Sequence, residues 1–392
     1  MKILFINEKG GFFGGVEQNI SFVAAALQKR GHECSLIYSQ KSSNSEIFFK
    51  DFKKVYEYRG MEKYDKLVLQ DCHNFIRNLN PDVIYLHKVK DLNICESLLD
   101  DFRILRMIHD HDLCCPRKHK YFIHNGKTCQ HPVGLRCYAD LAFLERRKNN
   151  YFGFGFNNIN QSMQNIIRHK KLEHLIVGSH YMMNELVING IDKTQISILP
   201  PCVPRPIIEW QPLPPNNNIL FVGQLIRGKG VDLLIESLAH ISEEFYCQIV
   251  GAGNAAPVIR KKIISLGLDS KVEIIDWVEN KELSAFYNNA KVVVVPSRWP
   301  EPFGMVGIEA MHYGRPVVGF DVGGISDWLK HDMNGLLVRE QDTKAMGLAV
   351  NSILEDDLFA NRLAKNAFNY SRRTYGFNEH IENLEHHLSG RH

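Results

Sequence analysis

Short apolar runs alternate with amphipathic stretches along the whole chain. In the first half the runs are KILFI, CSLIY, VIYLH, ILRMI and HLIVG, and their near-continuous hydrophobicity is typical of parallel strands covered on both faces. Residues 16–30 have helical periodicity, with apolar positions on one face from Val16 to Leu27 and Gly31 in the position of a C-cap. This alternation predicts an α/β unit with a parallel sheet.

The second half repeats the alternation with ILFVG, CQIVG, VEIID, KVVVVP, PVVGF and GLLV. Between the halves, PPCVPRPIIEWQPLPPNNN holds seven of the fifteen prolines and has no sustained period, which is typical of a stiff linker. We therefore predict an α/β fold with two Rossmann-like, doubly wound parallel-sheet domains facing a central cleft. The predicted boundaries are 1–200 for the N-terminal domain, 201–217 for the linker, 218–370 for the C-terminal domain and 371–392 for a final helix.

Composition and charge narrow the class of protein. A chain of 392 residues with 44% hydrophobic residues suits two or three domains of ordinary core size. A net charge of +3 is too small to favour nucleic acid, so no nucleic-acid partner is expected. The opening MKILFINEKGG lacks the apolar core of a secretory signal, and no run is long enough to span a bilayer. We therefore expect a cytoplasmic protein.

The nine cysteines are odd in number and irregularly spaced, so they predict reduced thiols and no disulfide framework. One loop-rich segment gathers zinc-type ligands: Cys114, Cys115, His119, His124, Cys129, His131 and Cys137. The paired CxxC knuckle of a structural zinc site is missing from it. We favour free thiols in an insertion, with a bound metal as the alternative.

Two glutamates, Glu301 and Glu309, flank the sequence PFGMVGI. Glu301 precedes Pro302 and is biased away from helical backbone, whereas the following residues predict a helix that begins near Phe303. An offset of eight residues, if mostly helical, spans roughly 12 Å. Between the carboxylates, the N-terminus of this helix offers free amides and a positive dipole end to an anion. The pattern favours a nucleotide sugar bound from end to end.

The segment SRWPEPFGMVGIEAMHYGRPVVGFDVGG resembles the Glu-x7-Glu signature of retaining glycosyltransferases, in particular those of family 4. The resemblance implies the GT-B fold, in which a C-terminal helix crosses back onto the first domain. It also implies roles for five residues. Glu301 would lie by the donor sugar, the amides of Gly304, Met305 and Val306 would hold the diphosphate, and Glu309 would bind the ribose hydroxyls.

A second motif, ILFVGQLIRGKG, resembles the GRL and KG elements of the same family. By that resemblance Lys229 binds the diphosphate. Gln224 stands where the family usually has an arginine, and Arg227 is the candidate that could compensate. Because this class stabilises the departing diphosphate with fixed cations and amides instead of a metal, the loss of one cation is expected to matter.

Three further sites follow from the resemblance. Gly14 and Gly15 lie in EKGGFFGGVEQ, which resembles the GGxE loop that faces the donor phosphate and the acceptor. His109, after the run ILRMI, resembles the histidine near the donor sugar hydroxyls, although the repeated HDHD leaves His111 as a competing candidate. The backbone of Val278 is placed near the nucleotide base.

A rival motif keeps a different class of enzyme open. In VGAGNAAPVIR, Gly251, Gly253 and Ala256 fit the dinucleotide pattern GxGxxA after a strand, and Asp276 follows about twenty residues later. This alternative is an NAD-dependent oxidoreductase, but no separate catalytic set accompanies the motif. A nucleotide-sugar epimerase on the same scaffold and a non-catalytic sugar-nucleotide binding protein also stay open.

The resemblance predicts transfer of a sugar from a UDP-, GDP- or ADP-sugar to a glycan, a lipid-linked glycan or a small acceptor. Retention of anomeric configuration, without metal or other cofactor, is part of that prediction. Of the two routes to retention, we favour attack on the face that the diphosphate leaves over a covalent glycosyl intermediate. The stretches ERRKNNYFGFGF and IIRHKK mix basic and aromatic residues, which suggests peripheral association with the inner face of a membrane.

Overall fold

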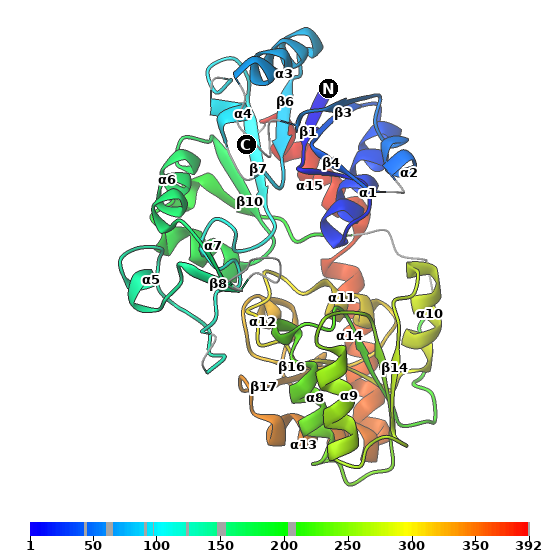
Figure 1. Cartoon of the computed structure of the whole chain (residues 1–392). Helices are drawn as coiled ribbons and strands as arrows, with labels where there is room; N and C mark the ends of the chain where they lie inside the picture. Colours follow the sequence, from blue (N-terminus) through cyan, green and yellow to red (C-terminus); the bar gives the residue numbers. More distant parts are fainter. Residues whose placement is uncertain are drawn as a thin grey trace. The chain divides into compact units, whose positions relative to one another are not determined.

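The chain forms two compact α/β units (Figure 1). The computed structural model describes residues 1–42, 45–59, 66–89, 92–96, 98–122, 125–146, 154–202 and 209–390. Unit 1 comprises Met1–Lys118, His131–Pro204 and Phe377–His392, and unit 2 comprises His119–Gln130 and Arg205–Gly376. The predicted α/β class with two parallel-sheet domains is confirmed.

Unit 1 is built on a seven-stranded parallel sheet with the order β11-β10-β7-β6-β1-β3-β5. Its strands are β1 (Lys2–Ile6), β3 (Glu33–Tyr38), β5 (Lys54–Glu57), β6 (Val83–Leu86), β7 (Ile104–Ile108), β10 (His174–Val177) and β11 (Ile196–Ile198). Two small two-stranded sheets accompany it, made of β2 (Lys9–Gly10) with β4 (Gln40–Lys41) and of β8 (Leu144–Arg146) with β9 (Phe154–Phe156).

The helices of unit 1 follow its strands along the chain. They are α1 (Gly15–Lys29), α2 (Ser45–Phe49), α3 (Lys66–Leu79), α4 (Asn93–Glu96), α5 (Arg136–Ala139), α6 (Ile159–His169), α7 (His180–Ile188) and α15 (Phe377–Ser389), with a 3-10 turn at Lys193–Gln195. The first helix agrees with the predicted range 16–30, and Gly31 after it has φ +88°, a backbone conformation that favours glycine.

Unit 2 is built on a six-stranded parallel sheet with the order β14-β13-β12-β15-β16-β17. Its strands are β12 (Asn218–Val222), β13 (Tyr246–Val250), β14 (Val272–Ile275), β15 (Val292–Val295), β16 (Val317–Phe320) and β17 (Gly335–Val338). Its helices are α8 (Val231–Leu238), α9 (Ala256–Ser265), α10 (Asn280–Asn289), α11 (Met305–His312), α12 (Ile325–Trp328), α13 (Thr343–Glu355) and α14 (Asp357–Thr374), and a 3-10 turn spans Arg227–Lys229.

The two sheets share one winding pattern. In each, the first strand is central, the next strands of the chain extend the sheet on one side, and the later strands extend it on the other. The winding therefore reverses between β1 and β6 in unit 1 and between β12 and β15 in unit 2. In open α/β sheets, ligands bind beyond the carboxyl ends of the strands at this point of reversal.

A hairpin that interrupts the sequence of unit 1 belongs to unit 2. Within His119–Gln130, Tyr121 forms an antiparallel bridge with Thr128, and the amide of Cys129 donates to the carbonyl of Lys120 at 2.8 Å. The amide and hydroxyl of Thr128 both donate to Oε1 of Glu340, at 3.1 and 3.2 Å. The predicted range 1–200 thus contains twelve residues, 119–130, that pack with the second unit.

The C-terminal residues divide between the units at Gly376. Helix α14 ends in unit 2, and α15 packs on unit 1 beside α1, as the red and blue ribbons in Figure 1 show. Arg30 Nε lies 2.8 Å from Glu385 Oε2, and Arg103 Nη1 donates to the carbonyls of His387 and Leu388 at 2.8 Å. The predicted linker 201–217 lies partly outside the described residues.

Apolar side chains of α15 complete one face of the unit 1 core. Ile381, Leu384 and Leu388 are buried against the same cluster as Ile3 and Phe5 of β1. Removal of the buried methyl groups of one such leucine costs about 2–5 kcal/mol, because the lost burial and the residual cavity add. The last helix is therefore an integral part of unit 1.

We expect Leu384→Ala to lower the free energy of unfolding of unit 1 by about 2–5 kcal/mol. All four tryptophans belong to unit 2, so tryptophan fluorescence during urea unfolding follows unit 2 while circular dichroism follows both units. The matched control is Leu358→Ala, which removes the same atoms from a side chain that is 86% exposed and should cost less than about 0.5 kcal/mol. Equal effects of the two substitutions would contradict the packing of α15.

Candidate active site

The loops that follow β12 and β15 lie at the winding reversal of unit 2 and carry the two principal predicted residues. Lys229 lies in the loop after β12, and Glu301 lies in the loop after β15. Because neighbouring parallel strands end at one edge of the sheet, the two loops begin side by side. Lys229 and Glu301 are 72 residues apart in the sequence and are nevertheless in direct contact.

The buried carboxylate of Glu301 is held by two donors. Lys229 Nζ donates to its Oε1 at 2.7 Å, and the Ser297 hydroxyl donates to the same oxygen at 2.6 Å. The side chain of Glu301 is 8% exposed and that of Lys229 is 28% exposed. A desolvated ion pair with a further hydrogen bond is expensive to break by removing one partner. The arrangement fixes Oε1 and leaves the other oxygen of the carboxylate outside these two bonds.

Backbone contact between the two loops sets this geometry. Gly230 has φ +67°, and a Cβ at this residue would lie 1.8 Å from the carbonyl oxygen of Pro296. The amides of Arg298 and Trp299 both donate to the carbonyl of Gly228 at 2.9 Å. A side chain at residue 230 would force the loops apart, so the lysine and the glutamate meet because residue 230 is a glycine.

A second ion pair reinforces the loops. Both terminal nitrogens of Arg298 donate to the carboxylate of Asp232 at 2.6 Å, and Nη1 also donates to the carbonyl of Arg227 at 3.1 Å. Burial alone would raise the pKa of Asp232, but the hydrogen bonds and charge of Arg298 outweigh it and lower that pKa. This bidentate geometry ties helix α8 to the loop after β15.

The N-terminus of helix α11 follows Glu301 directly. Gly304 has φ +93° and caps the helix, and Met305 and Val306 begin its first turn. Trp328 is fully buried and donates from Nε1 to the carbonyl of Phe303 at 2.6 Å, which fixes the approach to the helix. The first amides of a helix have no acceptor within the helix, so this turn can bind an anion.

The remaining donor-side predictions spread over three elements. Glu309 lies on α11, where its Oε2 accepts from the hydroxyl of the buried Tyr287 at 3.1 Å. Val278 follows β14 and is half-buried against the core of unit 2. Gln224 and Arg227 both lie in the exposed part of the Lys229 loop. The structure places these side chains in unit 2, and their predicted roles stay predictions.

The glycines of the rival dinucleotide motif have a packing explanation. A Cβ at Gly251 would lie 1.9 Å from the carbonyl oxygen of Gly223, and one at Gly253 would lie 2.3 Å from that of Leu225. These glycines permit the loops after β12 and β13 to pack backbone to backbone. In a dinucleotide-binding sheet the fingerprint follows the first, central strand, which is β12 here, whereas this motif follows β13.

Gly14, Gly15 and His109 lie in unit 1. The two glycines precede and begin α1, in the loop after β1 at the winding reversal of that sheet. His109 follows β7 and is half-buried, and its Nε2 lies 2.9 Å from Nδ1 of His87. The competing His111 is fully buried, with Nε2 3.0 Å from the hydroxyl of Tyr181. Of the two, the structure leaves His109 more accessible.

The cysteine and histidine cluster does not assemble a metal site among the residues that the structure describes, where no three such side chains are close enough to share an ion. Cys114, Cys115 and Cys129 are buried and take part in no disulfide, and Cys137 is half-buried. His124 lies outside the described residues.

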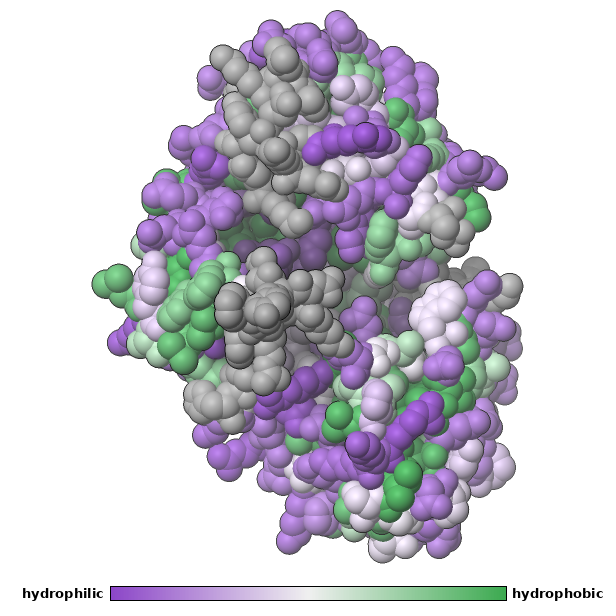
Figure 2. Space-filling model, viewed as in Figure 1, coloured by the Kyte–Doolittle hydropathy of each residue, from purple (hydrophilic) through white to green (hydrophobic). Residues whose placement is uncertain are grey.

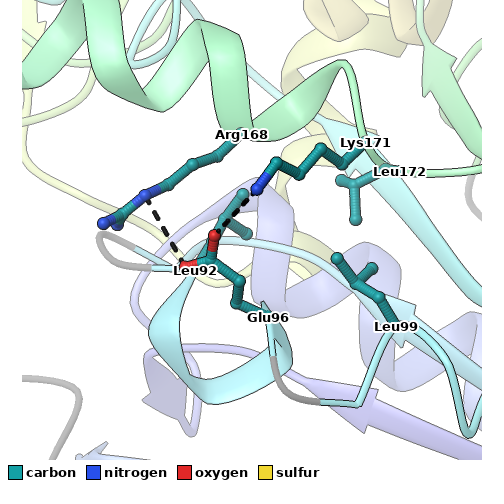
Figure 3. A pocket seen from close by; sticks show the side chains of 6 residues that line it. All are labelled: Leu92, Glu96, Leu99, Arg168, Lys171 and Leu172. Carbon is teal, nitrogen blue, oxygen red and sulfur yellow. Dashed lines mark hydrogen bonds and ion pairs between the residues drawn. The ribbon is translucent and has the colours of Figure 1, made fainter.

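Figure 3 shows a pocket of unit 1 that contains none of the predicted catalytic or donor-binding residues. Leu92, Leu99 and Leu172 line it, and Glu96 reaches across toward Arg168 at 3.8 Å and Lys171 at 3.2 Å. The carboxylate already pairs with both cations, so this pocket is a poor site for a diphosphate.

Sequence reasoning missed several residues that build these sites. Ser297, Arg298 and His87 act through contacts with residues far away in the chain. The only local signal for Ser297 was its place directly after an apolar strand at the carboxyl edge of a parallel sheet.

Two family models match the chain. Residues 207–370 match the family described as Glycosyl transferases group 1, and residues 13–205 match Glycosyltransferase Family 4. A D-inositol 3-phosphate glycosyltransferase of Xylanimonas cellulosilytica is 36% identical over 165 residues, which cover 41% of this chain and 39% of the relative. An uncharacterised glycosyltransferase of Methanocaldococcus jannaschii is 36% identical over 151 residues, 38% of each chain. These alignments span about two fifths of each relative.

Solved structures resemble the whole chain. HepE of Anabaena in complex with UDP has a TM-score of 0.75 at 16% identity over 100% of both chains. The lipopolysaccharide outer core galactosyltransferase WaaB has a TM-score of 0.73 at 18% identity, again over 100% of both. At these identities the likeness shows the fold, which is that of two parallel-sheet α/β domains.

We expect Gly230→Ala to destabilise unit 2 by at least about 2 kcal/mol more than Gly267→Ala. The two glycines have nearly the same φ, +67° and +66°, but a Cβ at Gly267 meets nothing within 4 Å. The difference between the variants therefore isolates the collision with Pro296. Urea unfolding followed by tryptophan fluorescence measures it, and equal losses would show that the loops do not depend on this contact.

Acid should destabilise unit 1 selectively. Burial lowers the pKa of His109 and His380 to about 4, and it holds the pKa of His87 and His169 well below the usual range. Between about pH 6.5 and pH 4 the unfolded chain binds protons that folded unit 1 does not, so its stability falls as the pH falls. We expect a loss of the order of 1 kcal/mol per histidine at pH 5, measured by urea unfolding. An unchanged midpoint between pH 7 and pH 5 would rule this out.

Proposed function

We propose that this chain is a GT-B glycosyltransferase of the family 4 type and that it transfers a sugar from a nucleoside diphosphate sugar to a hydroxyl of a glycan, a lipid-linked glycan or a small acceptor. The observation that carries the proposal is the Lys229–Glu301 pair, placed directly before the N-terminus of α11. A cation and free amides suit a diphosphate, and a fixed carboxylate suits sugar hydroxyls.

Each group has one part in the proposed donor site. Lys229 and the amides of residues 304–306 bind the diphosphate, and Glu301 accepts hydrogen bonds from the sugar. Glu309 binds the ribose hydroxyls, held by Tyr287, and the backbone at Val278 meets the base. Anabaena HepE is described in complex with UDP and with UDP-glucose, which supports a uridine nucleotide as the first donor to test.

Arg227 supplies the second cation in this proposal. Gln224 carries no charge where the family usually has an arginine, and Arg227 is an exposed cation of the same loop, two residues before Lys229. Charge on the leaving diphosphate increases as the glycosidic bond breaks, so fixed cations contribute most in the transition state. With both cations in place, the protein supplies this stabilisation from its own side chains and needs no metal.

The proposed reaction retains the anomeric configuration by same-face attack. The acceptor oxygen bonds to the anomeric carbon as the bond from that carbon to the diphosphate oxygen breaks. The acceptor proton passes to the departing phosphate oxygen, which balances the charge. In this proposal Glu301 orients the donor and forms no covalent bond to the sugar: Lys229 and Ser297 hold its Oε1, and its other oxygen accepts hydrogen bonds from the sugar hydroxyls.

The acceptor and any membrane contact are proposed for unit 1. Leu135 and Phe156 are 84% and 75% exposed, and Figure 2 shows apolar side chains gathered on the surface over α5. Arg136 adds a basic group there, whereas Arg168 and Lys171 pair with Glu96. None of the described helices is long and apolar enough to cross a bilayer. Peripheral association at the cytoplasmic face of a membrane therefore stays our proposal.

A ligand screen separates the proposed transferase from its alternatives. The midpoint temperature of thermal unfolding should rise when UDP, GDP or ADP is added and stay unchanged with NAD and CMP. Stabilisation by NAD alone would favour the oxidoreductase. Release of nucleoside diphosphate from a panel of nucleotide sugars, dependent on an added acceptor, then shows transfer. Binding without any release would favour the non-catalytic binding protein, and interconversion of the sugars would favour the epimerase.

Substitutions then test the assigned roles. Lys229→Met and Arg227→Ala should each weaken binding of the stabilising nucleotide by about tenfold or more, because a charge-assisted hydrogen bond is lost. Arg260→Ala, which removes an exposed cation on α9, is the matched control. Glu301→Gln should leave nucleotide binding nearly unchanged and reduce transfer. Equal losses for Arg260→Ala, measured by titration calorimetry, would show only a general effect of charge.

A further inference from the structure

Two imidazoles form a direct pair at the carboxyl edge of the unit 1 sheet. His87 follows β6 and His109 follows β7, which are adjacent parallel strands. Nδ1 of His87 lies 2.9 Å from Nε2 of His109, and the ring planes differ by 18°. The ring centres are 5.2 Å apart, so the two nitrogens lie nearly on the line between the centres. The contact is an in-plane N–H···N hydrogen bond.

The surroundings of His87 are closed and apolar. The ring is 1% exposed, lies parallel to the ring of Phe5 at 5.7 Å and meets that of Tyr85 at 4.3 Å. Its Nε2 is buried and has no hydrogen-bond partner among the described residues. Burial lowers the pKa of both imidazoles, that of His109 to about 4 although nearby Asp110 opposes the shift. Both rings are therefore neutral near pH 7 and carry one N–H each.

The hydrogen bond allows two arrangements of these protons. If His109 donated from Nε2, the proton of His87 would reside on its buried Nε2, an N–H without an acceptor. If His87 donates from Nδ1, its Nε2 is only an unpaired acceptor. Buried N–H groups without an acceptor are rarer in proteins than unsatisfied acceptors, because the unpaired donor keeps its full desolvation penalty. The second arrangement is therefore favoured, and it places the proton of His109 on Nδ1.

We propose that His87 is a positioning residue that fixes His109 as the Nδ1–H tautomer, so that His109 presents a hydrogen-bond donor to a carbohydrate hydroxyl oxygen. The identity of that ligand rests on the proposed function, whereas the tautomer does not. The hydrogen bond to His87 uses Nε2 of His109, and the ring of His109 is half-buried whereas that of His87 is closed in, so Nδ1 is the nitrogen left to meet a ligand.

A neighbouring ion pair holds the same two loops together. Lys88 and Asp110 directly follow the two histidines in the sequence, and Lys88 Nζ lies 2.5 Å from Oδ2 of Asp110. The backbone amide of Lys88 donates to Oδ1 of Asn7 at 3.0 Å, which further fixes this loop. The imidazole pair and the ion pair thus join one loop to the other, which orients His109.

The tautomer decides what His109 can do. Its Nε2 lone pair is occupied by the proton of His87, so His109 does not remove the acceptor proton in this state. It donates from Nδ1 instead, which suits a hydroxyl oxygen whose own proton points elsewhere. This agrees with transfer of the acceptor proton to the leaving phosphate, and it assigns His109 to sugar orientation.

Nuclear magnetic resonance of protein labelled with 15N-histidine tests the tautomer directly. At pH 7 and without any ligand, the signals of His109, identified by their loss in His109→Asn, should show the proton on Nδ1. His87→Asn places an amide donor near the former Nδ1 and should retain this tautomer, whereas His87→Phe should shift His109 toward Nε2–H. His73→Phe, at another buried histidine of unit 1, is the control and should leave His109 unchanged.

Kinetics of the same variants test the role in the reaction. His87→Phe should reduce kcat/KM for transfer by about tenfold, with partial rescue in His87→Asn and no change in nucleotide binding to unit 2. A proton on Nε2 of His109 in the wild type, or an unchanged tautomer in His87→Phe, would overturn the proposal. Lack of any transferase activity would instead overturn the proposed function and leave the tautomer result standing.

Discussion

The close approach of two backbone segments, Gly230 against the carbonyl of Pro296, is the constraint on which the candidate site depends. It brings the loops after two adjacent parallel strands so near that the Lys229 and Glu301 side chains meet, and Ser297 completes the contact. The carboxylate is therefore oriented before any ligand arrives. Such pre-organisation costs nothing at the moment of reaction, which is why fixed groups stabilise developing charge better than mobile ones.

The central strands of both sheets and the edge strands of the unit 2 sheet could be predicted from the sequence, whereas the two edge strands of the unit 1 sheet could not. β1, β7 and β15 are buried along nearly their whole length, so each appears as an unbroken apolar run. β5 (Lys54–Glu57) and β11 (Ile196–Ile198) lie at the two edges of the unit 1 sheet and are only partly buried. A partly buried edge strand needs no continuous apolar run, and both were missed for this reason.

Part of the candidate site could likewise be predicted from the sequence, and part could not. Motif spacing located Lys229 and Glu301, because the chemistry of a diphosphate and a sugar requires those residue types near a glycine turn. It could not identify His87, whose importance comes from a proton shared with a histidine 22 residues away. Spacing also could not tell a glycine that admits a ligand from one that admits another loop, and Gly251 is of the second kind.

The discontinuous make-up of both units has a consequence for synthesis on the ribosome. Thr128 of the hairpin 119–130 bonds to Glu340, which is translated 212 residues later. His32 lies 2.6 Å from Glu385, 353 residues later, because α15 closes the core of unit 1. In each unit, residues that leave the exit tunnel early therefore wait for contact partners that are translated much later. Until the last helix emerges, the apolar face around Ile3 and Phe5 lacks its natural cover, and nascent chains of this protein are candidates for chaperone protection.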